Sequence, residues 1–124
     1  VAHSDGDVAL HALMDAMLSA IGEKDIGHLF PVDDKKYDDA DSADLLRTVL
    51  GKVSEKGMGV QNVSVAIIAE RPMIAPFIDT MRNNVSAILG IPCEKIGITA
   101  TTNEQVGDLG NSKSVAAFAT VLLA

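Results

Sequence analysis

The stretch Ser4–Leu18 reads SDGDVALHALMDAML and sets the first element of the fold. It is rich in helix-forming residues, and after residue 6 no glycine or proline follows until Gly22. Serine is a favoured residue at helix N-termini, so the pattern predicts a helix with Ser4 as its cap. Because nearly every side of this helix is apolar, we expect it to be well buried, with His11 and Asp15 as polar exceptions.

Working outward from this helix, hydrophobic periodicity assigns the rest of the chain. The predicted elements are an irregular stretch at 24–31, a helix that starts at Asp41–Ser42 and ends at Gly57–Gly59, a strand at 60–69, a helix at 76–89 that ends at Gly90, and strands at 96–102 and 115–124. The second helix carries an apolar stripe of Leu45, Val49, Leu50 and Val53. Helices packed on one face of a small mixed β-sheet would bury this pattern, so we predict an α+β fold in a single domain over 1–124.

The charge and the aromatic content of the chain argue against some classes of binding partner. The 124 residues include 17 acidic and 10 basic side chains, which gives a net charge of −7. Such a chain repels nucleic-acid backbones and anionic membrane surfaces, and with 3% aromatic residues it is poorly suited to stacking on bases. The single Cys93 and the lack of a signal-like or spanning apolar segment predict a soluble cytoplasmic protein, or one of a plastid-type organelle if the source is eukaryotic.

The densest group of polar residues lies at 3–15. Two histidines and three carboxylates in this short stretch suit a divalent metal or acid–base chemistry. His11 and Asp15 are four residues apart, so they share one face of a helix and the carboxylate can orient the imidazole. The alternative is structural, because acidic residues also favour a helix N-terminus and a histidine can be a hydrogen-bonded core residue. Spacing alone leaves both open.

Two predicted strand ends carry the other candidate groups. Residues 101–104 read Thr-Thr-Asn-Glu, and their hydroxyls, backbone N–H groups and carboxylate suit phosphates with a bridging Mg²⁺ or Mn²⁺. Residues 69–72 read Ala-Glu-Arg-Pro, a rigid loop that can contact a base through main-chain groups. An ordinary turn after the first strand end and an ordinary crossover after the second remain the alternatives.

Together, these segments resemble the 2-C-methyl-D-erythritol 2,4-cyclodiphosphate synthase family of non-mevalonate isoprenoid biosynthesis. The resemblance spans essentially the whole chain and is most specific in AHSDGDVALHAL at 2–13. Supporting segments are DIGHLFP at 25–31, IAERP at 68–72 and ATTNE at 100–104. The resemblance implies a homotrimer with active sites shared between subunits. It also implies a lyase that converts 4-diphosphocytidyl-2-C-methyl-D-erythritol 2-phosphate to the cyclic diphosphate and CMP.

The resemblance further implies roles for individual residues. Catalytic roles are implied for His3, Ser4, Asp15 and Thr102. Substrate contacts are implied for His3, Ser4, Asp25, Gly27, Phe30, Pro31, Asp33, Asp34, Ala69, Pro72, Met73, Ile74, Ala75, Thr101 and Thr102. Within that set, Asp25 and Gly27 match the ribose and erythritol region, and 69–75 matches the cytosine pocket. Zn²⁺ is implied at His11 and Mg²⁺ or Mn²⁺ near Glu104.

Among the places where the chain departs from the family pattern, two concern the metal site and the central cavity of the trimer. The family's other two zinc ligands come from an Asp-x-His pair on a strand that would precede Val1. Asp108 and Asn111 stand where the family has an aromatic residue and an arginine, so we expect the central cavity of the trimer to bind isoprenoid diphosphates weakly. A non-catalytic trimeric relative that keeps a nucleotide pocket is therefore the alternative function.

Overall fold

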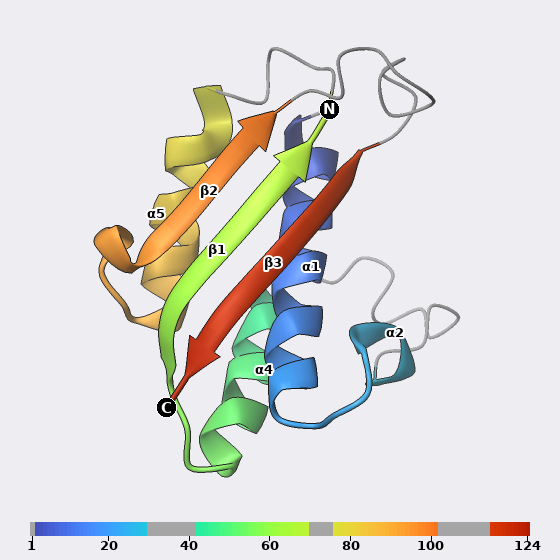
Figure 1. The fold of residues 1–124 in the computed structure, drawn as a ribbon, viewed down its shortest axis with the longest axis vertical. Helices are drawn as coiled ribbons and strands as arrows, with labels where there is room; N and C mark the ends of the chain where they lie inside the picture. Colours follow the sequence, from blue (N-terminus) through green and yellow to red (C-terminus); the bar gives the residue numbers. More distant parts are fainter. Residues whose placement is uncertain (1, 30–41, 70–75, 102–114) are drawn as a thin grey trace.

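The computed structural model describes residues 2–29, 42–69, 76–101 and 115–124. Its elements follow the chain as α1 (Ala2–Ala20), α2 (Ile26–Leu29), α4 (Ser42–Glu55), β1 (Val60–Ile68), α5 (Ile78–Leu89), the short 3₁₀ turn η2 (Cys93–Lys95), β2 (Ile96–Thr101) and β3 (Ala116–Leu123). The three strands form one sheet, and α1, α4 and α5 all cover the same face of it (Figure 1). The predicted α+β class, with helices on one face of a small mixed sheet, is confirmed.

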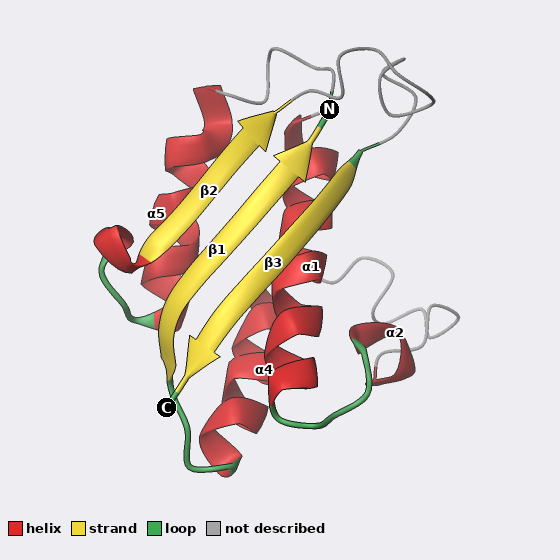
Figure 2. Ribbon diagram, in the orientation of Figure 1, coloured by secondary structure: helices red, strands yellow, loops and turns green. Residues whose placement is uncertain are grey.

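The sheet has the order β2-β1-β3, with β1 in the centre. The strands β1 and β2 are parallel, with Val63 opposite Ile96, and α5 makes the crossover that parallel neighbours require. The strands β1 and β3 are antiparallel, with Ser64 opposite Thr120 (Figure 2). The Arg82 side chain fixes the crossover, because its Nε donates to the Ile96 carbonyl oxygen at 2.9 Å.

The core lies between the sheet and the helices. Its fully buried side chains come from all of the long elements except α5 and β3 and are Leu13, Met14, Met17, Leu18, Leu46, Val49, Val53, Ile67 and Ile96. The helix α1 packs mainly beneath β3 and also contacts α4. This position explains why α1 is apolar on nearly every side, as the sequence predicted. In the part of the chain that the structure describes, no helix is long and apolar enough to cross a membrane.

Three details of the predicted elements were wrong. The first helix begins at Ala2, so Ser4 lies inside it and not at its cap; alanine is the strongest helix former, and the helix continues past the possible cap. The stretch predicted to be irregular contains the helical turn α2. In α4, Leu46 is fully buried while Leu50 is only half-buried, so the apolar stripe is rotated from the predicted one.

The other boundaries agree with the sequence to within one or two residues. Gly57 and Gly90 end α4 and α5 with φ values of 76° and 71°, which side chains with a Cβ rarely adopt. The final apolar segment is the strand β3, as its β-branched residues indicated. On the face of the sheet that the helices leave uncovered, β3 presents two large apolar side chains, Phe118 (63% exposed) and Leu122 (58% exposed).

Candidate functional site

The predicted site residues fall into three groups by what the structure describes. The side chains of His11, Asp15, Asp25, Ala69 and Thr101, together with Gly27, are described. His3 and Ser4 are described as backbone in the first turn of α1. Outside the described residues lie Phe30, Pro31, Asp33, Asp34, Pro72, Met73, Ile74, Ala75, Thr102, Glu104, Asp108 and Asn111.

One side of α1 carries several of these residues in register. Positions 11 and 15 lie seven and eleven residues beyond position 4, so all three line up along the helix. The His11 side chain is exposed. The neighbouring Asp15 is half-buried, and its Oδ1 accepts a hydrogen bond from the backbone N–H of Ile26 at 2.8 Å. Asp15 therefore attaches α2 to α1, a role that the sequence did not predict, and its role beside His11 stays a prediction.

The turn that leads into α2 is organised by Asp25. The Oδ1 of Asp25 accepts the backbone N–H of His28 at 3.0 Å, and the Nδ1 of the same histidine lies 2.6 Å from this oxygen. These hydrogen bonds from His28, first from the ring and then from the backbone, hold the pKa of Asp25 below its ordinary value. Gly27 sits within this turn and is exposed. The two predicted contacts to the ribose and erythritol are thus held in one short, exposed structure.

A second group of predicted residues meets at the carboxyl ends of the parallel strands. Ala69 follows β1 and is buried, and its N–H donates to the carbonyl oxygen of Thr101 at 2.9 Å. Thr101, the last residue of β2, is exposed. The N-terminal turns of α1 and α5 lie at the same end of the molecule (Figure 1). Ligands commonly bind at the carboxyl ends of parallel strands, where loops and helix N-termini meet.

These two groups do not form a single cluster within this chain. Helix α1 has 19 residues and is about 28 Å long at 1.5 Å per residue. The carboxyl ends of β1 and β2 lie at the end of the molecule where α1 begins, whereas α2 lies toward the C-terminal end of α1 (Figure 1). His11 occupies an intermediate position along the helix.

The metal ligands are incomplete in the described part of the chain. Among these residues, no group of three or more His, Cys, Asp or Glu side chains is close enough to hold a metal ion. Catalytic zinc sites use three protein ligands, and the exposed His11 supplies one donor nitrogen. The described residues therefore do not by themselves fit a zinc ion.

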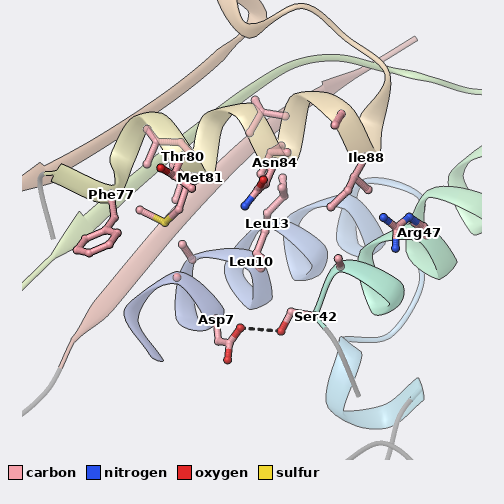
Figure 3. Close-up of a pocket in the computed structure, with 18 residues that line it drawn as sticks. Asp7, Leu10, Leu13, Ser42, Arg47, Phe77, Thr80, Met81, Asn84 and Ile88 are labelled. Carbon is pink, nitrogen blue, oxygen red and sulfur yellow. Dashed lines mark hydrogen bonds between the residues drawn. The ribbon is translucent and has the colours of Figure 1, made fainter. Parts of the chain in front are cut away.

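A cavity of about 590 Å³ lies between α1, α4, α5 and the sheet (Figure 3). Its walls are mostly apolar and include Leu10 from α1 and Met81 from α5. At its edge, the Ser42 hydroxyl donates to Oδ1 of Asp7 at 2.9 Å and so joins the start of α4 to α1. Among the described residues that line this cavity there is no predicted site residue. Sequence patterns did not predict the cavity, since a gap between helices depends on their packing.

Comparison with known proteins places this geometry in a family. The model of the YgbB family matches residues 1–124. The 2-C-methyl-D-erythritol 2,4-cyclodiphosphate synthase of Symbiobacterium thermophilum is 48% identical over 122 residues, which cover 98% of this chain and 78% of the relative. That of Treponema denticola is 49% identical over 98% of this chain and 76% of the relative.

Solved structures agree with this assignment. The IspF–CDP complex of Plasmodium falciparum has a TM-score of 0.81 and 31% identity, covering 94% of this chain and 69% of that one. The bifunctional IspDF of Campylobacter jejuni has a TM-score of 0.88 and 34% identity, covering 94% of this chain and 31% of that one. Fold, motif positions and identity over nearly the whole chain agree. The chain therefore belongs to the YgbB family, the enzyme family of the 2-C-methyl-D-erythritol 2,4-cyclodiphosphate synthases.

Proposed function

We propose that this chain forms a 2-C-methyl-D-erythritol 2,4-cyclodiphosphate synthase, a lyase that releases CMP from 4-diphosphocytidyl-2-C-methyl-D-erythritol 2-phosphate. In the proposed reaction the 2-phosphate of the substrate attacks the β-phosphorus. A P–O bond forms there, and the bond to CMP breaks. The observation that carries the proposal is the meeting of Ala69 and Thr101 at one edge of the sheet, at the end of the molecule where α1 begins.

The first turn of α1 suits the phosphates of this substrate. It contains His3 and Ser4, and the backbone N–H groups of a helix N-terminus attract anions. The attacking group is already an anion, so the protein has to position it and needs no strong base to activate it. Thr101 and Thr102 are proposed to hold the nucleotide phosphates from the strand end. The cytosine is proposed to bind residues 69–75, and the loop Phe30–Asp34 to cover the substrate.

Divalent metals would reduce the repulsion between the reacting phosphates, which a chain of net charge −7 cannot do alone. We propose that His11 is one zinc ligand and that Glu104 binds Mg²⁺ or Mn²⁺. The chain spans about three-quarters of the length of its curated relatives. Within the described residues, β3 is an edge strand and α1 packs beneath it. A strand carrying an Asp-x-His pair would lie close to α1 if it paired at this edge.

The uncovered face of the sheet supports the proposed homotrimer. Phe118 and Leu122 lie on the same face of β3, four residues apart, and both are more than half exposed. Contiguous exposed apolar groups commonly mark protein–protein interfaces. Sedimentation of the wild-type protein should give a trimer, and Phe118→Asp should shift it toward monomer. A wild-type protein that sediments as a monomer would refute the assembly.

The decisive experiment follows CMP release by the full-length protein in the presence of Zn²⁺ and Mg²⁺. The expected result is formation of CMP and the cyclic diphosphate by the wild-type protein. A calorimetric arm compares Glu104→Gln with wild type, and the variant should lose more affinity for CDP than for CMP, which has no β-phosphate. Binding of CDP without turnover would favour the non-catalytic relative, and absence of both would refute the proposal.

A further inference from the structure

The four-residue helix α2 is held by two aspartate side chains, which accept hydrogen bonds from its backbone N–H groups. An isolated helix this short is unstable, so its conformation depends on outside contacts. Asp15 of α1 binds the N–H of Ile26, whose side chain is buried in the core. Asp25 binds the N–H of His28, the third residue of the helix, in the manner of an N-cap. The position of the Asp25 carboxylate is therefore fixed relative to α1.

His28 adds a second restraint on the same carboxylate oxygen. Its Nδ1 lies 2.6 Å from Oδ1 of Asp25. An ionised carboxylate can only accept, so Nδ1 must carry the hydrogen, and in the neutral ring Nε2 is then the acceptor. Both hydrogen bonds from His28 end on Oδ1, and no residue in the described part of the chain is bonded to Oδ2. The Asp25 side chain is 55% exposed, so solvent and ligands can reach it.

We propose that His28 is a positioning residue that holds Oδ1 of Asp25 and thereby presents Oδ2 to a hydroxyl group of the sugar or polyol part of the substrate. This inference rests on the proposed function, in which Asp25 contacts the ribose and erythritol region. A carboxylate oxygen accepts strongly from a hydroxyl, and a fixed orientation lowers the entropy lost when the hydroxyl binds.

Because both side chains are exposed, a role of His28 in positioning Asp25 can be distinguished from a role in stabilising the fold. His28 is 65% exposed and Asp25 55%, and exposed pairs at this spacing add little to folding stability. Loss of the His28 ring should therefore change ligand binding much more than unfolding. The lowered pKa of Asp25 agrees with the role, because it keeps the carboxylate ionised and able to accept.

The test compares His28→Ala with His28→Asn in the full-length protein. Alanine removes the ring donor, whereas the asparagine side chain places an N–H near the position of Nδ1. We expect His28→Ala to raise KM for the substrate about two- to tenfold with kcat and melting temperature unchanged, and His28→Asn to restore most of the loss. Arg47→Ala is the matched control, since Arg47 makes an exposed pair with Asp44 at the same spacing on α4.

A second measurement does not depend on activity. The ¹⁵N shifts of the His28 ring should show hydrogen on Nδ1 in the neutral state. Hydrogen on Nε2 instead, or an active wild-type enzyme whose KM is unaffected by His28→Ala, would overturn the positioning role while the proposed function stands. A wild-type protein that binds neither the substrate nor CDP would refute the proposed function, and the role of His28 in polyol binding with it.

Discussion

Replacing Asp15 by alanine tests how the two ends of the proposed site are connected. The carboxylate of Asp15 accepts the backbone N–H of Ile26 across eleven residues of sequence at 2.8 Å. Ile26 is 8% exposed, so after the substitution its N–H has little access to water. We expect α2 to open locally more often while the core of α1 and α4 stays folded.

The size of the effect follows from the kind of hydrogen bond. A bond to a charged group contributes about 1.5–3 kcal/mol, and because Asp15 is only half-buried we expect the lower part, about 1.5–2 kcal/mol. Since 1.4 kcal/mol corresponds to a factor of ten, protection of the Ile26 amide from hydrogen exchange should fall about ten- to thirtyfold. Exchange measured by NMR in native conditions reports this amide directly.

Asp15→Asn is the matched control, because its side-chain oxygen can still accept from Ile26. It should lose much less protection than Asp15→Ala. Unchanged protection of the Ile26 amide in Asp15→Ala, together with a shift of the His11 ring resonances, would show that Asp15 does not hold α2. Asp15 would then act on His11, as the helix spacing suggests, and α2 would be held by its buried Ile26 side chain.

Three further predictions concern metal, core and pH. His11→Ala in the full-length protein should lower bound zinc and abolish CMP release, whereas His28→Ala should retain zinc; metal analysis compares the two. Leu46→Ala, at a fully buried position, should reduce the free energy of unfolding by about 2–5 kcal/mol in urea titrations, and Met58→Ala, at an exposed one, by much less. The pKa of Asp25 is lowered in the folded state, so ionised Asp25 favours folding above the ordinary carboxyl pKa, and this contribution is lost as pH falls through the folded value. An NMR titration should show that low midpoint, and His28→Ala should raise it.

Most of the fold was accessible from periodicity and from residues with strong conformational preferences. The alternation from Val60 onward marked a strand with one buried face, and Gly90 marked the end of a helix in the left-handed conformation. The helical turn α2 was missed because it has no periodicity of its own. The acceptor for its first backbone N–H, that of Ile26, is Asp15, which lies on a different element.

The sequence predicted which residues belong to the candidate site, but it did not predict their hydrogen-bond partners. The spacing of His11 and Asp15 placed them correctly on one side of a helix, and the family resemblance named the strand ends at Ala69 and Thr101. The sequence suggested a contact between Asp15 and His11, whereas the structure directs a carboxylate oxygen of Asp15 to Ile26. Spacing along a helix determines which side chains are neighbours but not which competing donor each one binds.

The α+β class, the order of the elements and the chemical types available for catalysis could all be predicted from the amino-acid sequence, because they depend on local periodicity and residue chemistry. Three features became visible only in the folded chain: α1 lies beneath β3, the strand ends and α2 lie at different ends of α1, and His28 binds Asp25. Helix packing and the choice of hydrogen-bond partner depend on contacts between segments that are far apart in the sequence. No segment of the chain contains that information alone.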